Sequence, residues 1–465
     1  MMSVKPFDFS QLFVQQPLKE QKKFGKKLRT AFPFEELGHY TATDRDPNQL
    51  MDEVRAILIP ELLPERTQRV NQSSFAFFRG TAELMEYDLA QQANSPIHAV
   101  SCGDAHIGNF GFFGSPERQL LFDLNDFDES GISPFEWDLK RLAVSTLLAG
   151  REHSFDEQAL TTLVKALGQT YRESLQEMFK KTALNRFYPV NSVETVLSTI
   201  PLKEAQTKKL KKFLDKAGKR DSEQVVRKFT VTDSDGQIAF KETPPRTRHV
   251  EDRVTKHITK YLSQYRQSLA PDVSLMLSQY HVTDIVRHSV GVGSFGSLCY
   301  LLLLTGTDDS HLVLQIKEAL PHRQLADQVN VQNVQYEQNE GKRIVDCQKI
   351  LQSASDAFLG YFATEKKSFY VRQFRDMKAS IDLSALDWDQ FDAYAKTCAW
   401  VLGIAHAQSP TAGVILGYTG HSENFDSAIQ SWTAAYVEQV NQDFASFKRY
   451  RHLWCHPLID RHPIG

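Results

Sequence analysis

The stretch VGVGSFGSLCYLLLLTG, residues 290–306, decides the fold of this chain. Its first half has three glycines, Gly291, Gly293 and Gly296, in the spacing GxGxxG, and its second half is an apolar run. That spacing occurs in strand-to-helix loops that bind dinucleotides, and also in glycine-rich hairpins that cover the phosphates of a nucleotide. The residues after the glycines must therefore distinguish between the two structures.

A dinucleotide-binding loop requires a helix after the glycines and an acidic residue about twenty positions later. Glu318 lies 22 residues beyond Gly296, so the acidic residue does not exclude this structure. The segment SLCYLLLLTG, residues 297–306, has instead the composition of a strand that ends in a turn. We therefore expect a β-hairpin whose glycine loop covers phosphates. The expected phosphate-covering residues are Gly291, Gly293, Ser294, Phe295 and Gly296.

The next strand, HLVLQIKEA at residues 311–319, carries Lys317 within an otherwise apolar run. A buried lysine is costly unless it meets an anion, and protein kinases place the lysine that holds the α- and β-phosphates on this strand. The alternative is a lysine at a strand end that extends to water. The helix predicted after this strand should supply an acidic partner for Lys317, and the candidates are Glu337, Glu340 and Asp346.

A second polar cluster lies about 190 residues upstream, in CGDAHIGNFGFF at residues 102–113. Phosphotransferases of the kinase type need a carboxylate that takes the proton of the acceptor hydroxyl, and an amide oxygen a few residues later that holds magnesium. Asp104 and Asn109 are five residues apart and match those two roles. His106 is either a ligand or a residue that braces the loop by a hydrogen bond.

The acidic segment FDLNDFDES, residues 122–130, is expected to supply a second magnesium ligand, from Asp123, Asp126 or Asp128. The alternative is a solvated turn whose carboxylates cap a helix. A calcium-binding EF-hand fails here, because Trp137 stands where the bidentate glutamate is required. A metallophosphoesterase could use GDAH, but the chain has no further motif that completes a two-metal centre.

The composition limits the class of protein. The chain has 465 residues, 41% of them hydrophobic, and a net charge of −3, which suits a globular protein of two or three domains and indicates no nucleic-acid partner. Five scattered cysteines without a CxxC pair argue against a disulfide framework or a zinc site. No segment resembles a signal peptide or a membrane span. We therefore expect a cytoplasmic protein.

Apolar periodicity and turn residues predict the elements around these motifs. Residues 1–70 favour helices, and the pattern FEWDLKRLAVSTLLAG predicts a helix that ends at Gly150. Residues 155–279 are mostly helical, apart from a hairpin at 230–242. Antiparallel strands are expected from Tyr280, and helices return from Phe391.

Seven motifs of this chain, taken together, resemble the signature of the bacterial domain-of-unknown-function family 2252. In order they are FAFFRGT, CGDAHIGNFGFF, FDLNDFDE, FEWDLKRLA, VGVGSFG, KEA and FYVRQFRDMK. The resemblance covers most of the chain, from about Phe75 to the FDSAIQSWTAAYVEQ segment at 425–439. The family is similar to the protein-kinase-like superfamily, which implies ATP and Mg²⁺ as ligands.

Similarity to aminoglycoside-phosphotransferase-like kinases refines the residue roles. In those kinases the metal-binding aspartate lies about twelve residues before an aspartate that braces the catalytic loop, which implies Asp126 as the ligand and Asp138 as the brace. Cys102 departs from the histidine usual at its position, and the candidates for the glutamate that normally pairs with the lysine include an aspartate. Gln373 and Phe374 are expected to meet the adenine. For Arg79 a structural ion pair is expected, with anion recognition as the alternative.

The order of the motifs departs from ordinary kinases. If FDAYAKTCAWVLGIAHA, residues 391–407, is the helix that normally precedes the catalytic loop, every element is present but rotated in sequence, as in a circular permutation. We expect an α+β, two-lobed, kinase-like fold with a small antiparallel β lobe and a large helical lobe. The expected segments are an N-terminal helical extension at 1–70, catalytic and metal loops with helices at 71–279, a nucleotide-binding small lobe at 280–378, and closing helices at 379–465.

The expected activity is phosphoryl transfer from ATP, with Mg²⁺, to a hydroxyl of an unidentified small molecule or protein. Asp104 would be the base, Asn109 and Asp126 the metal ligands, and Lys317 the phosphate anchor. The alternatives are a nucleotide-binding pseudokinase, a nucleotidyltransferase and, last, a metallophosphoesterase. The sequence identifies neither the acceptor nor the oligomeric state, because acceptor pockets diverge freely within one fold.

Overall fold

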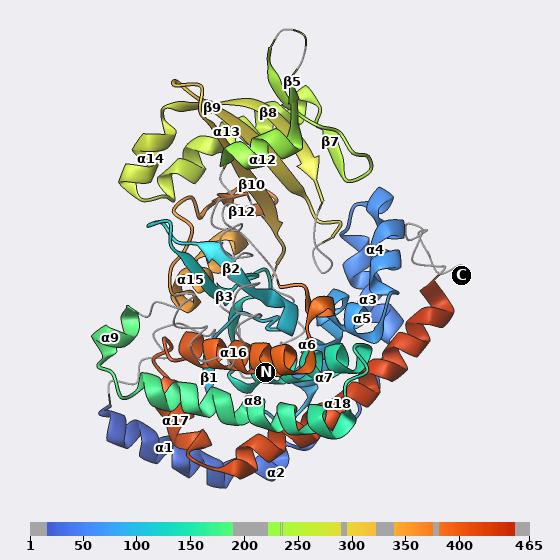
Figure 1. Ribbon diagram of the computed structural model, residues 1–465, viewed down its shortest axis with the longest axis vertical. Coiled ribbons are helices and arrows are strands. Elements are labelled where there is room, and N and C mark those ends of the chain that lie inside the picture. Colours follow the sequence, from blue (N-terminus) through green and yellow to red (C-terminus); the bar gives the residue numbers. More distant parts are fainter. Residues whose placement is uncertain are drawn as a thin grey trace, which may run out of the picture.

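The chain combines a small antiparallel β part with a larger helical part in a computed structural model (Figure 1). The structure describes residues 16–188, 222–232, 234, 236–289, 295–321, 339–374 and 381–451. Within these residues, no helix is both long and apolar enough to cross a membrane. Cys102, Cys299, Cys347 and Cys398 are free, in agreement with the prediction from their scatter in the sequence, and all four are buried.

A six-stranded antiparallel sheet forms the β part, in the order β11-β12-β10-β9-β8-β7. Its strands are β7 (Thr247–His249), β8 (Tyr280–His288), β9 (Cys299–Gly306), β10 (His311–Ala319), β11 (Gly360–Ala363) and β12 (Ser368–Gln373). The expected run of antiparallel strands from Tyr280 is confirmed, because β8, β9 and β10 are neighbours in sequence and in the sheet. Lys317 on β10 pairs with Cys299 on one side and Tyr370 on the other.

Alternating side chains bury both faces of this sheet. Leu302, Leu314 and Ile316 face helices α13 (Asp252–Gln267) and α14 (Pro271–Leu277). Leu301 and Val313 face the other side, toward α12 (Ser222–Phe229) and the hairpin of β5 (Thr230–Thr232) and β6 (Ile238–Phe240). The hairpin expected at 230–242 is thus confirmed. Helix α15 (Glu340–Leu351) packs against β11 and β12.

The helical part surrounds the largest hydrophobic core, in which Trp432, Phe135 and Tyr171 are fully buried. Its helices are α5 (Ser74–Gly80), α6 (Ala82–Gln91), α7 (Glu136–Glu152), α8 (Glu157–Met178), α9 (Ala183–Phe187), α16 (Trp388–His406), α17 (Ala412–Thr419) and α18 (Glu423–Tyr450). The prediction that Gly150 ends its helix is wrong, since α7 continues to Glu152. A Cβ at Gly150 would lie 2.1 Å from Leu160 Cδ2, so the glycine allows α8 to approach α7 closely.

The N-terminal residues form helices, as predicted, from Leu18 onward. They are α1 (Leu18–Ala31), α2 (Phe34–Leu37), α3 (Pro47–Ala56), the 3-10 turn η2 (Pro60–Leu62) and α4 (Leu63–Val70). Helix α1 lies along α17, where a Cβ at Gly25 would be 2.1 Å from the Val414 carbonyl oxygen. Figure 1 shows α3 and α4 nearer the six-stranded sheet than α1. The N-terminal segment therefore extends from α17 of the helical part toward the six-stranded sheet.

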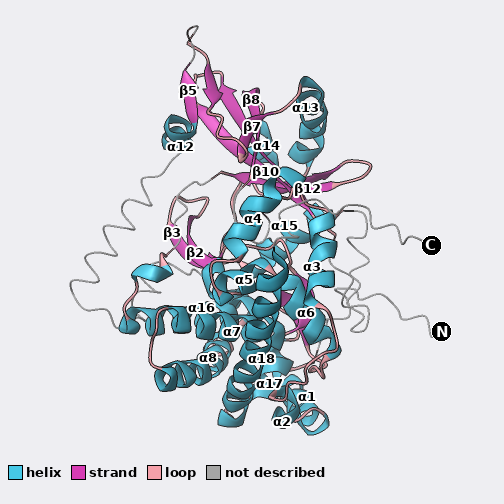
Figure 2. Ribbon diagram, turned by 90° about the vertical axis from the view of Figure 1, so that its right-hand side faces the viewer, coloured by secondary structure: helices cyan, strands magenta, loops and turns pink. Residues whose placement is uncertain are grey.

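Two small strand pairs lie outside the large sheet, and Figure 2 shows one of them, β2 with β3, between α16 and the large sheet. Strand β1 (His98–Ser101) pairs with β4 (Gly131–Pro134), and β2 (Phe110–Gly114) pairs with β3 (Leu120–Leu124). The 3-10 turn η3 (Ile107–Asn109) precedes β2, and a second such turn, η6 (Leu383–Ala385), precedes α16. Residues 102–109, between β1 and β2, and residues 122–130, from the end of β3 to β4, are called the catalytic loop and the metal loop after the roles predicted for them.

Candidate functional site

Asp138, in the first turn of α7, holds the catalytic loop by hydrogen bonds to its main chain. The Asp138 carboxylate accepts hydrogen bonds from the main-chain N–H of Cys102 at 2.9 Å and of Gly103 at 3.0 Å. His406 Nε2 on α16 lies 3.2 Å from the same carboxylate. Gly103 has a φ of +78°, which favours glycine, and a Cβ there would collide with the Glu129 carbonyl oxygen. The bracing role predicted for Asp138 is confirmed.

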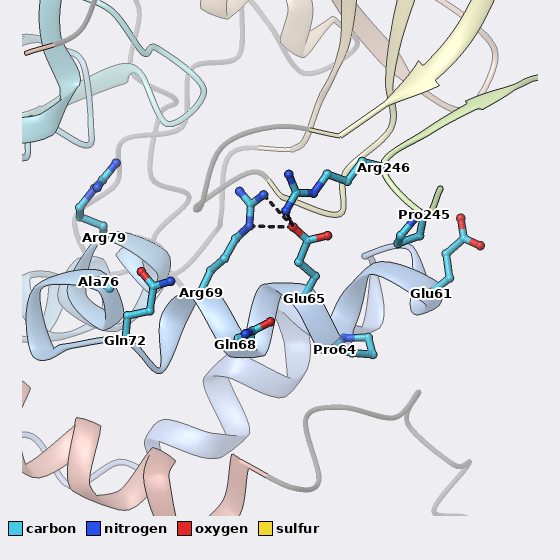
Figure 3. A pocket seen from close by; sticks show the side chains of 10 residues that line it. All are labelled: Glu61, Pro64, Glu65, Gln68, Arg69, Gln72, Ala76, Arg79, Pro245 and Arg246. Carbon is cyan, nitrogen blue, oxygen red and sulfur yellow. Dashed lines mark hydrogen bonds and ion pairs between the residues drawn. The ribbon is translucent and has the colours of Figure 1, made fainter. Parts of the chain in front are cut away.

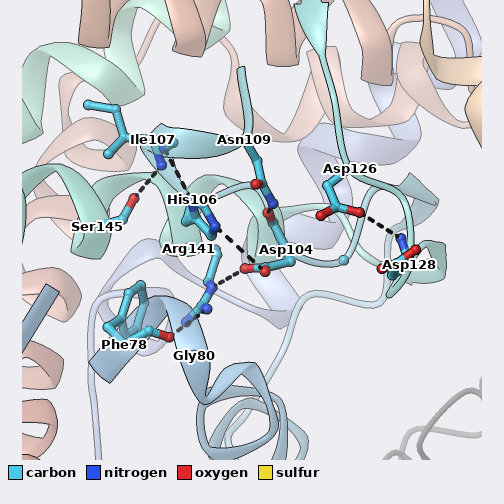
Figure 4. Close-up of polar contacts among 12 residues, drawn as sticks. Phe78, Gly80, Asp104, His106, Ile107, Asn109, Asp126, Asp128, Arg141 and Ser145 are labelled. Atoms are coloured by element: carbon cyan, nitrogen blue, oxygen red, sulfur yellow. Dashed lines mark hydrogen bonds and ion pairs between the residues drawn. The ribbon is translucent and has the colours of Figure 1, made fainter. Parts of the chain in front are cut away.

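Asp104 extends from this loop and meets Arg141, one turn further along α7. Arg141 Nε donates to Asp104 Oδ1 at 2.6 Å, and a second nitrogen of Arg141 donates to the Phe78 carbonyl oxygen at 2.8 Å (Figure 4). Only 15% of the Asp104 side chain is exposed. Burial raises the pKa of Asp104 to about 6, although Arg141 opposes this rise. Asp104 is therefore mostly ionised at neutral pH, and it becomes mostly protonated once the pH falls below about 6.

His106 braces the loop. Its Nδ1 accepts a hydrogen bond from the Gly108 N–H at 3.0 Å, and its Nε2 lies 3.9 Å from Asp104 Oδ2. Burial, together with the positive charges of Arg79 and Arg141, lowers the pKa of His106 well below its usual value. The imidazole is therefore neutral, and the geometry agrees with the bracing alternative.

Asn109 and Asp126 are the pair expected to hold magnesium. Asn109 Nδ2 donates to the Asp104 carbonyl oxygen at 2.7 Å, and Figure 4 shows the Asp126 side chain extending toward Asn109 and Asp104. The negative charge of Asp126 contributes to the raised pKa of Asp104. The described residues contain no cluster of three or more histidine, cysteine, aspartate or glutamate side chains that could hold a metal. An amide and a carboxylate oxygen fit Mg²⁺, which takes few protein ligands when phosphates supply others.

Lys317 reaches the metal loop from the large sheet. Its Nζ lies 2.6 Å from Asp128 Oδ2, and the Tyr370 hydroxyl donates to Asp128 Oδ1 at 2.7 Å. Burial would lower the pKa of Lys317, but Asp128 raises it well above its usual value. Burial would likewise raise the pKa of Asp128, but Lys317 lowers it below its usual value. The two residues form a buried ion pair between the sheet and the acidic turn.

The acidic partner of Lys317 thus comes from the metal loop. The α15 candidates have other partners, because Glu340 pairs with Arg343 and Asp346 lies 2.5 Å from Lys342. Glu337 lies outside the described residues. Arg343 is fully buried and donates to the carbonyl oxygens of Ser130 and, at 3.2 Å, Asp128. Sequence reasoning missed this arginine, because nothing in a charged helix marks one arginine as buried.

Asp123, the remaining aspartate of the metal loop, has a structural role. It is fully buried, and its Oδ2 accepts hydrogen bonds from the main-chain N–H and the hydroxyl of Ser353, both at 2.9 Å. The metal loop is therefore tied to the end of α15 at Asp123 and to β10 at Asp128, with Asp126 between these two attachments.

A family model described as "Uncharacterized protein conserved in bacteria (DUF2252)" matches residues 56–450. The chain belongs to this family. The matched range contains the catalytic loop, the metal loop and the six-stranded sheet. Comparison of the chain with curated proteins and with solved structures gave no match.

The glycine loop of the DUF2252 chain is described only at its end. Gly291, Gly293 and Ser294 lie outside the described residues. Phe295 is fully buried beneath the Arg69 guanidinium, which lies 4.2 Å from the centre of its ring. The Ile59 N–H donates to the Gly296 carbonyl oxygen at 2.8 Å. The N-terminal segment around α4 thus fastens the end of this loop.

Gln373 ends β12 and Phe374 follows it, at the place where the adenine was expected. The Phe374 ring is buried on the α12 side of the sheet, with ring centres 5.2 Å from Phe229 and 5.7 Å from His288. The Gln373 N–H donates to Asp356 Oδ2 at 2.5 Å. Nearby, Arg372 Nε donates to Gln315 Oε1 at 3.0 Å. Contact between these residues and an adenine stays a prediction.

With the described residues, Arg79 does not form the ion pair that its position in FFRGT suggested. Among the described residues it has no acidic partner within ion-pair distance, and its buried Nε has no hydrogen-bond partner. The guanidinium lies 5.4 Å from the Phe75 ring centre. Its Cζ would be 3.4 Å from a Cβ built on Gly108, so Arg79 lies beside the catalytic loop. The ion-pair prediction is wrong for the described part of the chain, and anion recognition remains open.

Proposed function

We propose that the DUF2252 chain is an ATP- and Mg²⁺-dependent phosphotransferase of the kinase-like type, acting on a hydroxyl group. The observation that carries this proposal is the meeting of Lys317 from the sheet with Asp128 of the metal loop, at 2.6 Å, beside Asp126 and the catalytic-loop residue Asp104. A strand lysine, a metal-loop aspartate and a loop aspartate are the groups that kinase-type phosphoryl transfer uses.

The order of elements in the β part supports a kinase-like small lobe. Strand β8, the glycine stretch, β9, the lysine strand β10 and helix α15 follow one another. In protein kinases the glycine loop likewise precedes a lysine on the third strand, which is followed by helix αC. Helix α16 follows after β11, β12 and η6, and its Tyr394 hydroxyl donates to the Ile107 carbonyl oxygen in the catalytic loop at 3.0 Å. This contact supports a permuted order, with α16 as the helix that accompanies the catalytic loop.

In the proposed reaction the acceptor oxygen forms a bond to the γ-phosphorus of ATP, and the bond from that phosphorus to the β,γ-bridging oxygen breaks. The proton of the hydroxyl moves to an Asp104 oxygen, and ADP leaves. Asn109 and Asp126 would hold Mg²⁺, which when bound neutralises charge on the phosphates. Lys317 would exchange part of its contact with Asp128 for a phosphate oxygen.

One observation favours the alternative of a pseudokinase. Lys317 is already neutralised by Asp128, whereas kinases pair this lysine with a glutamate of the following helix. A chain that keeps this pair on binding nucleotide would not transfer phosphate. Turnover separates this alternative from the proposed enzyme.

Thermal unfolding with Mg-ATP tests the proposal. A ligand at a hundred times its Kd stabilises the folded state by about 2.7 kcal/mol. We expect Mg-ATP to raise the Tm of the wild type and of Asp104→Asn, and not that of Asp126→Ala. Asp382→Asn, which changes an aspartate that caps the remote η6 turn, is the matched control. No stabilisation of the wild type would overturn the proposal.

Labelled ATP then distinguishes the reactions. Transfer of label from γ-labelled ATP to a metabolite or protein indicates phosphorylation, and transfer from α-labelled ATP indicates nucleotidyl transfer. We expect only the γ-label to be transferred, and Asp104→Asn to abolish transfer. Stabilisation by Mg-ATP without transfer of either label would indicate the pseudokinase.

A further inference from the structure

A cavity of about 820 Å³ opens between α4, α5 and the turn before β7. Figure 3 shows the side chains that line it, among them Glu65, Arg69, Arg79 and Arg246. Arg79 comes from α5, Arg69 from α4 and Arg246 from the turn beside the large sheet. The helical part and the β part therefore both contribute to this cavity, next to the catalytic loop.

Arginines outnumber acids around the cavity. Arg69 and Arg246 share one carboxylate, because Arg69 lies 2.8 Å from Glu65 Oε1 and Arg246 pairs with the same oxygen. Glu61 is shared in the same way by Arg287 and, at 3.2 Å, Arg248. Each glutamate can neutralise only one of its two arginines. The wall consequently carries excess positive charge, which attracts anions.

Arg79 adds a further positive charge, and among the described residues it forms no ion pair, although Asp104 and Glu152 act on its charge from a greater distance. Its Nε is buried without a hydrogen-bond partner, and burying a charged group is costly unless a partner compensates for lost water. Arg79 lines the cavity and lies beside Gly108 of the catalytic loop, and its charge interacts with that of Asp104. An anion in the cavity would supply the partner that Arg79 lacks, close to the proposed base.

We propose that this cavity binds the phosphate group of a phosphorylated small molecule, with Arg79 and Arg246 as its main ligands. Guanidinium groups bind phosphate by two parallel hydrogen bonds, and several of them favour a doubly charged anion over a carboxylate. The molecule would present its hydroxyl to Asp104 and so be the acceptor. This role rests on the proposed phosphotransfer, whereas the binding of phosphate does not.

Calorimetric titration with inorganic phosphate at neutral pH tests the site. We expect the wild type to bind phosphate, and Arg79→Gln and Arg246→Gln each to weaken binding about tenfold, a loss of about 1.4 kcal/mol. Arg253→Gln is the matched control, because this arginine is exposed on α13 and lies outside the cavity. Arg79→Lys keeps the charge but loses the planar fork, so its affinity should lie between those of the wild type and Arg79→Gln.

Several results would overturn the inference: no binding of phosphate by the wild type, equal affinity in Arg79→Gln, or acetate binding as tightly as phosphate. The Tm of each variant without ligand reports whether it folds. Arg246 has a side chain that is 54% exposed, so Arg246→Gln should fold even if Arg79→Gln does not. Loss of phosphate binding in Lys317→Met, with Arg79→Gln unaffected, would place the anion at the nucleotide site instead.

Mg-ATP titrations separate this inference from the proposed function. We expect Arg79→Gln to bind Mg-ATP as the wild type does, and Asp126→Ala to keep its affinity for phosphate. If the wild type binds phosphate but not Mg-ATP, the phosphotransferase proposal is wrong and the anion site stands. If it binds Mg-ATP but not phosphate, the anion site is wrong and the phosphotransferase proposal stands.

Discussion

Lys317 Nζ and Asp128 Oδ2 lie 2.6 Å apart, although one belongs to the large sheet and the other to the loop between β3 and β4. The exposed fraction is 5% for the Lys317 side chain and 20% for that of Asp128. Tyr370 shares the carboxylate by donating its hydroxyl to Oδ1. This contact joins the β part to the metal loop, and the stability of the chain should depend on it.

Removing one member of this ion pair should be more harmful than removing both. Lys317→Met leaves the Asp128 charge without its main partner, and breaking a buried pair in this way costs about 3 kcal/mol or more. The double variant Lys317→Met with Asp128→Asn should lose less than the sum of the two single variants, which urea unfolding can measure. Strictly additive losses would show that the pair is not coupled.

Asp104 should make stability depend on pH. Its pKa is raised from 3.8 to about 6 by burial, so between these values the folded protein keeps a proton that the unfolded chain has released. Stability from this group is present below about pH 4 and is lost as pH rises through 6, by about 3 kcal/mol in all. Asp104→Asn lacks this loss. The free energy of unfolding of the wild type, minus that of the variant, should fall from pH 4 to pH 7, and a flat difference would contradict the shift.

Arg141 should act as a positioning residue through Asp104. Its charge lowers the pKa of Asp104 against the effect of burial, so Arg141→Met should move the titration of Asp104 to higher pH. To measure this movement, the free energy of unfolding of the double variant Arg141→Met with Asp104→Asn is subtracted from that of Arg141→Met. This difference should fall at a higher pH than the corresponding difference in the wild-type background. Arg141→Lys keeps the charge and should restore much of the wild-type titration. An unchanged titration midpoint in Arg141→Met would assign Arg141 a purely structural role.

Gly296 should tolerate a side chain poorly for two reasons. Its φ of +107° is unfavourable for residues with a Cβ, and an added Cβ would lie 3.2 Å from Leu58 Cβ. Gly236 is a matched control, since its φ is +79° but an added Cβ would meet nothing within 4 Å. Gly236→Ala should cost about 1 kcal/mol from backbone strain alone, and Gly296→Ala should cost more. Equal losses in thermal unfolding would show that the contact with Leu58 is unimportant.

Much of the local structure could be predicted from the sequence. The strands after Tyr280, the hairpin at 230–242 and the N-terminal helices agree with the structure, because alternation and turn residues act over a few neighbouring positions. The bracing of the catalytic loop by Asp138 was also predicted, because the resemblance to aminoglycoside-phosphotransferase-like kinases implied it. The family was recognised from motifs that keep their order along the chain.

The errors concern contacts between segments that are distant in the sequence. Gly150 looks like a helix end, but α7 continues past it. Because Gly150 has no side chain, Leu160 on the next helix can pack closely against it. Arg79 looks like one half of an ion pair, yet within the described residues no acid comes within ion-pair distance of it. Local patterns contain no information about which helix will lie opposite a given side chain.

The sequence by itself determined the elements, the loops and the residue types that could carry phosphoryl transfer, because propensity and spacing are properties of short segments. Only the tertiary structure decided that Lys317 meets Asp128 instead of an acid on α15, and that arginines from α4, α5 and the turn before β7 line one cavity. Both results depend on how the β part docks on the helical part. That docking is set by the burial of many side chains at once, and no single motif encodes it.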